Sequence, residues 1–256
     1  NCIKEGKPIT DVIHFAGLKS VNESITNPIN YWDVNVYGTI KLIEVMRRNK
    51  CFSLVFSSSA TIYQNTKNEK LHENSPIKPI NPYGMTKITI ENFLNDIYKS
   101  EPNKWKIINL RYFNPIGAHD SGLIGETPKD MPNNIFPKLM DVAENNKRHF
   151  KVFGNDWPTE DGTCIRDYIH IMDLAEGHVA ALRNLYEDNS QFNSYNLGTG
   201  KGSSVLELIN TFQKVNKVRI NYHFTKRRKG DLYKVVADNS LAVEKLKWKP
   251  TKNLEE

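Results

Sequence analysis

The letters SSSATIY at residues 57–63 and PYGMTK at residues 82–87 decide the fold that we predict for this chain. The apolar run Leu54-Val55-Phe56 leads directly into the serines and is typical of a buried strand. Open α/β sheets bind ligands beyond the carboxyl ends of their strands. The serine cluster is therefore expected to lie at a binding site.

Tyr83 and Lys87 are four residues apart at the start of a helical pattern, so both side chains are predicted to share one helix face. A free tyrosine ionises near pH ~10, and an ammonium group one turn away lowers the pKa of the phenol. Tyr83 could then exchange a proton with a substrate hydroxyl, and the Ser59 hydroxyl could hydrogen-bond the same oxygen. Taken alone, a tyrosine and a lysine at this spacing more often belong to an ordinary amphipathic helix face. The serine cluster upstream is what supports a catalytic role.

A series of segments, taken together and in order, resembles the UDP-glucose 4-epimerases, a family of the extended short-chain dehydrogenase/reductase superfamily. The segments are HFAGLK at 14–19, FSSSAT at 56–61, YGMTK at 83–87, RYFNPIGA at 111–118, FGND at 153–156, TEDGT at 159–163, RDYIH at 166–170, NLG at 196–198 and RRKGD at 227–231. They extend over nearly the whole chain, which is far more specific than any single motif.

The resemblance implies a fold of the α/β class, a Rossmann-type doubly wound parallel sheet with a smaller α/β substrate-binding domain. Residues 1–115 would form a partial NAD-binding domain. Residues 116–256 would mainly bind the UDP-sugar, with some segments returning to the first domain. A homodimer built on the helices predicted at 29–46 and 82–98 is implied as well. The apolar stripe of the second helix could equally be core.

The family resemblance also implies a role for each site residue. Catalysis would use Ser59, Tyr83 and Lys87. NAD would contact Phe15, Ala16, Gly17, Lys19, Asn35, Ser57, Tyr83, Lys87 and Phe113. The UDP-sugar would contact Lys19, Ser59, Tyr83, Asn114, Asn134, Ile135, Phe153, Arg166, Arg228, Asp231 and Val235.

The implied reaction is the reversible epimerisation of UDP-galactose and UDP-glucose at C4, as part of galactose metabolism. Tyr83 takes the proton of the 4-hydroxyl, hydride passes to NAD, the 4-keto sugar turns over, and hydride returns to its other face. Related 4,6-dehydratases carry an Asp-Glu pair directly after the serine position, whereas Ala60 and Thr61 stand here and cannot act as acid or base. Val235 lies where some relatives place a tyrosine beside the sugar, so we expect tolerance of N-acetylated sugars.

The start of the family pattern is not found in this sequence. Three strands, two helices and a Gly-x-x-Gly-x-x-Gly loop for the pyrophosphate are expected ahead of the predicted strand at 12–15. GTGKG at 198–202 lies too late in the chain and is interpreted as a turn before a helix that Ser203 or Ser204 caps. We therefore expect an N-terminally incomplete chain, which alone neither holds NAD tightly nor turns over.

The net charge, one basic stretch and the length of the apolar runs bear on nucleic-acid and membrane binding. The formal net charge is +6, and KRRK at 226–229 could be a nucleic-acid patch, a solvated loop or a clamp for a phosphorylated ligand. The resemblance favours the clamp, so we expect no nucleic-acid partner. Two alternatives stay open. One is a non-catalytic nucleotide-sugar-binding or RNA-binding member of the fold, and the other is an epimerase of UDP-N-acetylglucosamine or UDP-glucuronate. No apolar run approaches the ~20 residues of a membrane span, so no membrane partner is expected.

The cysteines and histidines give little support to metal chemistry. Cys2, Cys51 and Cys164 are odd in number and widely spaced, which is typical of reduced thiols in a cytoplasmic protein. The seven histidines form no His-x-x-x-His pair, so no metal site is expected.

Further strands are predicted at 106–112 and 219–224, helices at 171–186 and 205–215, and a loop at 117–132.

Overall fold

The computed structural model describes residues 6–64, 70–126, 134–145, 148–187, 190–228 and 231–256. Cys2, Lys229, Gly230 and residues 127–132 of the loop predicted at 117–132 lie outside these described residues.

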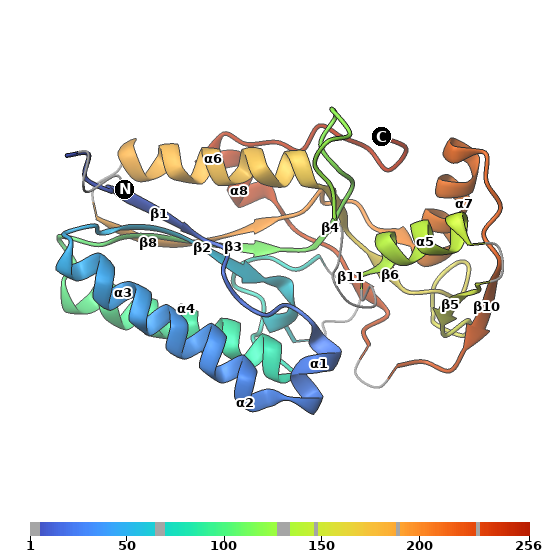
Figure 1. Ribbon diagram of the computed structural model, residues 1–256, viewed down its shortest axis with the longest axis horizontal. Coiled ribbons are helices and arrows are strands. Elements are labelled where there is room, and N and C mark those ends of the chain that lie inside the picture. The colour runs from blue at the N-terminus through green and yellow to red at the C-terminus, as the bar shows by residue number, and fades with distance from the viewer. Residues whose placement is uncertain (1–5, 65–69, 127–133, 146–147, 188–189, 229–230) are drawn as a thin grey trace.

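A four-stranded parallel sheet forms the centre of the molecule (Figure 1). Its order is β1 (Asp11–His14), β2 (Ser53–Ser59), β3 (Lys106–Tyr112) and β8 (Gln191–Leu197). Residues along β2 alternate between two cores, with Leu54 and Phe56 in one and Val55 in the other. That alternation is what a strand covered on both faces requires. The predicted α/β class with a parallel sheet is confirmed.

Figure 1 shows helices in a layer on each face of this sheet. On one face lie α3 (Gly38–Arg48) and α4 (Pro82–Ser100), where Ile43, Ile90 and Leu94 pack on the sheet. On the other face lie α6 (Ile171–Glu187) and α8 (Ser240–Leu246). The strand β8 and these two helices come from the second half of the chain and return to the sheet.

The helix predicted at 29–46 is one helical run with an irregular middle. It comprises α2 (Pro28–Tyr31), the π-helix η1 (Trp32–Tyr37) and α3, and it follows the short helix α1 (Val21–Thr26). A π-turn accommodates an extra residue and is frequent at functional sites. The helix predicted at 82–98 is α4, and its apolar stripe packs into the core.

A smaller part of the molecule lies beyond the carboxyl ends of the strands, where β3 runs on into β4 (Asn114–Ile116) (Figure 1). Its helices are α5 (Ile135–Glu144) and α7 (Val205–Asn216), which share a core with β5 (Phe150–Phe153). The other strands are β6 (Ile165–Arg166), β7 (Tyr168–His170), β9 (Ser203–Ser204), β10 (Tyr222–Thr225) and β11 (Lys234–Val235).

The helix α7 and the strand β10 of this smaller part each start at a defined residue. The helix α7 begins after Ser204, whose side chain forms a capping box with Glu207, so Ser204 and not Ser203 is the cap. The strand predicted at 219–224 is shorter and starts later, because only residues from Tyr222 onward pair with β5.

Candidate active site

The serine cluster forms the end of β2 itself. Ser57, Ser58 and Ser59 are all buried, and Ser59 lies opposite Tyr112 of β3. The Ser59 hydroxyl caps the short 3₁₀ helix η2 (Ala60–Ile62), accepting from the Thr61 amide at 3.3 Å and from the Thr61 hydroxyl at 3.0 Å. This cap ends the strand and turns the chain, so that the Ser59 oxygen is fixed at the sheet edge.

The first turn of α4 is docked against this strand end. Asn81 caps the helix by accepting from the Gly84 amide at 2.8 Å, and Pro82 occupies the first helical position. A Cβ added to Gly84 would lie 2.8 Å from the Thr61 carbonyl oxygen, so only glycine allows this approach. Tyr83 and Lys87 are thereby brought to the end of β2.

Lys87 is a buried cation that is only partly satisfied by the protein. Its Nζ donates to the Ser57 carbonyl at 2.6 Å and lies 4.9 Å from the Phe56 ring centroid and 5.7 Å from that of Tyr83. Burial lowers the pKa of Lys87 to about 8, and the charge of Glu91 opposes that shift. Among the described residues one acceptor is found for three N–H groups, so two donors are left for a ligand.

The pKa of Tyr83 differs from the prediction. Burial raises it above its usual value, although an interaction with Ser59 acts in the opposite direction. The prediction that Lys87 lowers this pKa is therefore wrong for the protein without its ligands. The physical reason is that desolvation of the phenolate dominates, while the hydrogen bond of Lys87 goes to the Ser57 carbonyl and not to the phenol.

A buried polar network lies directly behind these residues, and the sequence analysis missed it. Glu91 holds Arg111 through two hydrogen bonds of 3.0 and 2.6 Å and accepts from the Ser58 hydroxyl at 2.5 Å. Arg111 also donates to the Tyr63 hydroxyl at 2.9 Å, which in turn donates to Asn196 at 2.7 Å. The available signal was a charged residue, Arg111, inside the strand predicted at 106–112.

The candidate cofactor residues after β1 lie on an exposed loop that Asn35 braces. The Asn35 side chain accepts from the Leu18 amide at 2.7 Å and donates to the Leu18 carbonyl at 3.0 Å and to Thr86 at 3.3 Å. A Cβ on Gly17 would come 3.0 Å from the Asn35 side-chain oxygen. The π-helix thus carries a buried side chain that ties the β1 loop to α4, next to Lys87.

The remaining members of the predicted cofactor set lie in different surroundings. Phe15, Ala16, Gly17 and Lys19 are exposed at the end of β1. Phe113 is buried in a cluster with Ala60 and Ala237, against which Val235 packs. Val235 also pairs with Arg166 between β11 and β6. The structure therefore connects the candidate sugar residue Val235 to the strand end that carries Ser59.

The candidate UDP residues form a more open group in the smaller part. The guanidinium of Arg228 lies 3.8 Å from the Phe153 ring centroid, and Asp231 lies 4.0 Å from both Arg228 and Arg166. Burial, together with the charges of Arg228 and Lys151, lowers the pKa of Lys138 of α5. Lys138 is a further cation that the sequence analysis missed, because nothing in the sequence shows that α5 lies beside Arg228.

The candidates Asn114, Asn134 and Ile135 lie where the two parts of the molecule meet, and Lys19 contacts the same region. Lys19 and Asn134 both bind Glu126, at 3.0 and 2.9 Å, and Ile135 opens α5 directly after Asn134. The Asn114 amide donates to the Asp167 carbonyl at 3.0 Å, where β4 begins to pair with β7. These contacts bring the β1 loop and the start of α5 together.

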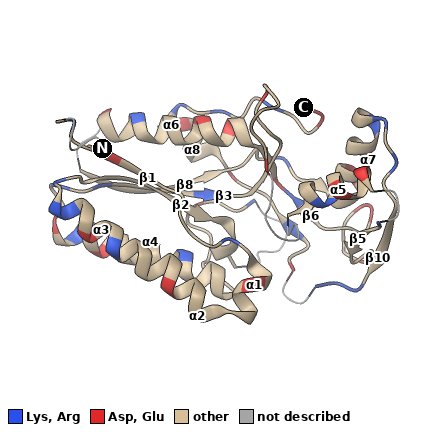
Figure 2. Ribbon diagram, viewed as in Figure 1, with Lys and Arg blue, Asp and Glu red and all other residues tan. Residues whose placement is uncertain are grey.

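The basic stretch after β10 is divided among different partners, as far as it is described. Arg227 stacks on Trp157, with 4.1 Å from its guanidinium to the ring centroid, and donates to Asp156 at 2.7 Å. Figure 2 shows Lys and Arg on the chain that follows β10. Arg228 lies over the ring of Phe153.

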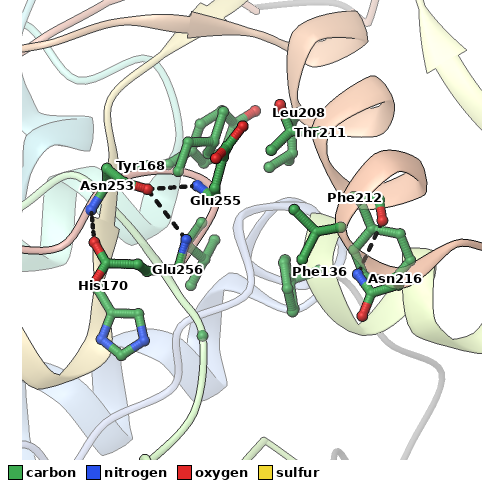
Figure 3. A pocket seen from close by; sticks show the side chains of 14 residues that line it. Phe136, Tyr168, His170, Leu208, Thr211, Phe212, Asn216, Asn253, Glu255 and Glu256 are labelled. Carbon is green, nitrogen blue, oxygen red and sulfur yellow. Dashed lines mark hydrogen bonds between the residues drawn. The ribbon is translucent and has the colours of Figure 1, made fainter.

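A mostly apolar cavity between α5, α7 and the residues at 253–256 is separate from this site (Figure 3). Phe136, Tyr168, His170 and Phe212 line it, and none of the predicted site residues does. The described residues contain no group of three His, Cys, Asp or Glu side chains that could hold a metal ion. No helix in the described ranges is long and apolar enough to cross a membrane.

Comparison with known proteins places the chain among sugar-nucleotide enzymes. The family profile described as GDP-mannose 4,6 dehydratase matches residues 2–256. UDP-glucose 4-epimerase 1 of Oryza sativa subsp. japonica is 51% identical over 247 residues, which are 96% of this chain and 70% of that protein.

Two solved structures are similar over 99% of this chain and 75% of their own. The UDP-glucose-4-epimerase of Stenotrophomonas maltophila, with bound NAD and formylated UDP-arabinopyranose, has a TM-score of 0.95 at 42% identity. The UDP-glucose 4-epimerase of Bifidobacterium longum, in complex with NAD+ and UDP, has a TM-score of 0.92 at 43% identity. From this similarity over almost its whole length, the chain belongs to the UDP-glucose 4-epimerase family.

Proposed function

We propose that this protein interconverts UDP-galactose and UDP-glucose by inverting C4 of the sugar through a transient 4-keto sugar, with NAD as its bound cofactor. The observation that carries the proposal is the meeting of Ser59, Tyr83 and Lys87 at the carboxyl end of β2. That arrangement occurs in a chain of this family, whose relatives include epimerases crystallised with NAD and UDP or a UDP-sugar.

The residues present fit the nicotinamide half of NAD. Lys87 is buried with two N–H groups still to be satisfied among the described residues, which suits the hydroxyls of a ribose. Gly17 and the exposed loop around it leave the end of β1 open beside Asn35. When bound, NAD would supply the hydride acceptor and, in its oxidised form, a positive charge.

Tyr83 is the group that removes and returns the proton of the sugar 4-hydroxyl. Its phenol keeps its proton in the protein alone, because burial raises its pKa. The Lys87 ammonium, 5.7 Å from the ring, favours the phenolate once a second positive charge is present. Ser59, fixed by its capping role, is placed to hydrogen-bond the same sugar oxygen.

The UDP end would be held in the smaller part of the molecule while the sugar turns. Arg166 and Arg228 flank Asp231 and are suited to a diphosphate, because guanidinium forks match phosphate oxygens. Phe153 offers a ring face beside Arg228. Anchoring UDP in the smaller part of the molecule, and not at Tyr83, would leave the sugar free to present either face.

Epimerisation is favoured over dehydration, although the matching family profile is described by a dehydratase. Dehydration needs an acid and a base for the proton and the hydroxyl that leave. The residues that follow Ser59 are Ala60 and Thr61, and the Thr61 hydroxyl donates to Ser59. No carboxyl group is placed at these two positions.

The experiment is conversion of UDP-galactose by the full-length protein, with Tyr83→Phe beside it. We expect UDP-glucose from the wild type and a rate lower by about 10²- to 10⁴-fold in the variant, the range for a lost general acid–base. Tyr186→Phe is the matched control, because the Tyr186 hydroxyl lies at the far end of the sheet beside Asp11. Equal rates in wild type and Tyr83→Phe would remove Tyr83 from this role.

Other UDP-sugars are a second candidate, favoured by one residue. Val235 packs on the Phe113 and Ala60 cluster and leaves more room than a tyrosine would. UDP-N-acetylglucosamine is therefore proposed as an additional substrate.

The proposal also includes a homodimer and a location in the cytoplasm. Apolar side chains are exposed along α2, η1 and α3, and they support a homodimer on this helical layer; they are Ile29, Trp32, Val34, Tyr37 and Val45. Sedimentation of the protein as a monomer would contradict this. Cys51 and Cys164 are free and buried, which supports a location in the cytoplasm. A role in galactose metabolism follows from the proposed substrates.

A further inference from the structure

The strand β10 has an open edge, away from the candidate active site. It pairs with β5 on one side, and no other strand of the described residues lies on its other side. Figure 1 shows β10 at the outer margin of the smaller part. Tyr222 and Phe224 are 38% and 43% exposed there, with 5.8 Å between their ring centroids. The edge is therefore a partly apolar surface that the described segments leave uncovered.

The backbone hydrogen bonds fix which residues of β10 face this edge. The carbonyl oxygens of Asn221 and Thr225 accept from the first amide of β5 and from the amide just after it, at 2.7 and 2.8 Å. Because the backbone groups of successive residues point to opposite sides of a strand, those of Tyr222 and Phe224 point to the open edge. No hydrogen bond to them is found there among the described residues. Two amides and two carbonyls are thus available to an added strand.

Exposed cations lie at both ends of this strand. Lys217 and Arg219 precede β10, Lys226 follows it, and all three are exposed. Within the described ranges none of the three forms an ion pair, whereas Arg227 is paired with Asp156. The strand itself reads YHFT and carries no Lys, Arg, Asp or Glu. An uncharged edge that can pair is therefore flanked by positive charge on both sides.

We infer that the open edge of β10 is a docking site for an extended peptide segment with acidic residues at its ends, which adds to β10 as a further strand. Its main chain pairs with the outward groups of Tyr222 and Phe224. Every second side chain of the added strand lies beside these two rings, which suits apolar residues. Its terminal carboxylates meet the flanking cations, so the charges of the two surfaces are complementary.

Two other occupants fit this edge less well. A second copy of β10 would bring positive ends together in either orientation, and like charges across a strand pair repel. A single-stranded nucleic acid stacks successive bases on ring faces. The rings of Tyr222 and Phe224 stand at 80° to each other, so they do not offer two parallel faces in succession.

The test is the binding of defined peptides to the full-length protein, measured by calorimetry. The probe is a capped peptide of alternating valine and threonine with glutamates at each end, and its matched control carries lysines in their place. We expect the acidic peptide to bind about tenfold more tightly, because every terminal charge changes sign. Equal affinities, or no saturable binding of the acidic peptide, would overturn the inference.

Methylation of the acidic peptide at one backbone nitrogen at a time tests the strand pairing without changing the protein. Every second methyl group along the centre removes a hydrogen bond to β10 and should weaken binding by about fivefold. The methyl groups between them point away from β10 and should have little effect. A loss that does not alternate along the peptide would show that no strand is added.

Tyr222→Pro tests the same contact from the side of the protein. Proline removes the outward N–H and leaves the bonds of Asn221 and Thr225 to β5 in place. Tyr222→Ala is the matched control, because it removes the ring and keeps the N–H. We expect Tyr222→Pro to bind the acidic peptide about fivefold more weakly than Tyr222→Ala. Equal binding by the two variants would contradict the pairing, and the methylated peptides decide it if Tyr222→Pro does not fold.

The two other occupants are tested with the same proteins. A single-stranded oligouridylate that binds the wild type more tightly than the acidic peptide would make this edge a nucleic-acid surface and overturn the inference. Self-association that Tyr222→Pro alone abolishes, measured by sedimentation, would make it an interface between copies and overturn the inference as well.

Discussion

The catalytic end of β2 and the UDP side of the candidate site are built in opposite ways. Behind Ser59 and Lys87, charged groups are buried and paired at close range, as in the 2.6 Å contact of Arg111 with Glu91. Around Phe153, the cations are partly exposed, and Arg228 lies 4.0 Å from its acidic neighbour Asp231. The first region fixes geometry before any ligand arrives, whereas the second keeps charge available for one.

The largest expected effect is on stability and comes from the buried region. Glu91→Gln leaves the Arg111 guanidinium buried without its counter-charge, and should lower the free energy of unfolding by about 3–5 kcal/mol. Urea unfolding measures this free energy. Asp156→Asn, in the exposed pair with Arg227, is the matched control and should lower the free energy of unfolding far less.

The double variant Glu91→Leu with Arg111→Met sharpens this comparison. Removing both charges avoids the unpaired ion, so most of the lost stability should return. Equal losses in Glu91→Gln and Asp156→Asn would show that the two regions do not differ in this way.

The open region should affect binding more than chemistry. Arg228→Ala removes a guanidinium that would bind the diphosphate, and should weaken UDP binding by about 10- to 100-fold, as expected for a charged hydrogen bond. Calorimetry with UDP measures this. Lys226→Ala, two residues earlier and also exposed, is the control and should bind nearly as the wild type does.

The pH dependence of turnover tests the buried cation. Burial lowers the pKa of Lys87 to about 8, so the ammonium is present below that pH and is lost as the pH rises through it. Turnover should therefore decline above about pH 8, approaching tenfold per pH unit. A rate that stays constant up to about pH 10 would contradict a catalytic role for the Lys87 charge.

The smallest expected effect concerns sugar choice at Val235. The wild type should turn over UDP-N-acetylglucosamine, and Val235→Tyr should reduce that rate several-fold, about 3- to 10-fold, while sparing UDP-glucose. Product analysis by chromatography measures both rates. Absence of any turnover of the N-acetylated sugar by the wild type would contradict the idea, for example because Tyr233 fills the space.

Local pattern predicted the helix that carries Tyr83 and Lys87, the strand β3 and a helix cap at Ser203 or Ser204, because each depends on neighbours in sequence. Only the structure decides between the two serines. The pairing of Glu91 with Arg111 and of Tyr112 with His178 could not be predicted. It depends on sheet register and on which helix covers which face.

The pKa of Tyr83 was predicted in the wrong direction for a related reason. Spacing along a helix gives the neighbouring charge but not the depth of burial, and burial dominates here. The roles given to individual site residues and the domain boundary at residues 115 and 116 stay predictions.

The π-helix at Trp32–Tyr37 sets a limit on how this chain can change in length. Each residue turns an α-helix by about 100°, and this run has one buried contact within its irregular turn and one beyond it: Asn35 with the β1 loop, and Ile43 with the sheet. Deleting one residue within it would restore regular winding but rotate one of these contacts out of place. Insertions and deletions should therefore be tolerated in the connecting loops and not in this helix, because its length fixes the position of the β1 loop relative to the core.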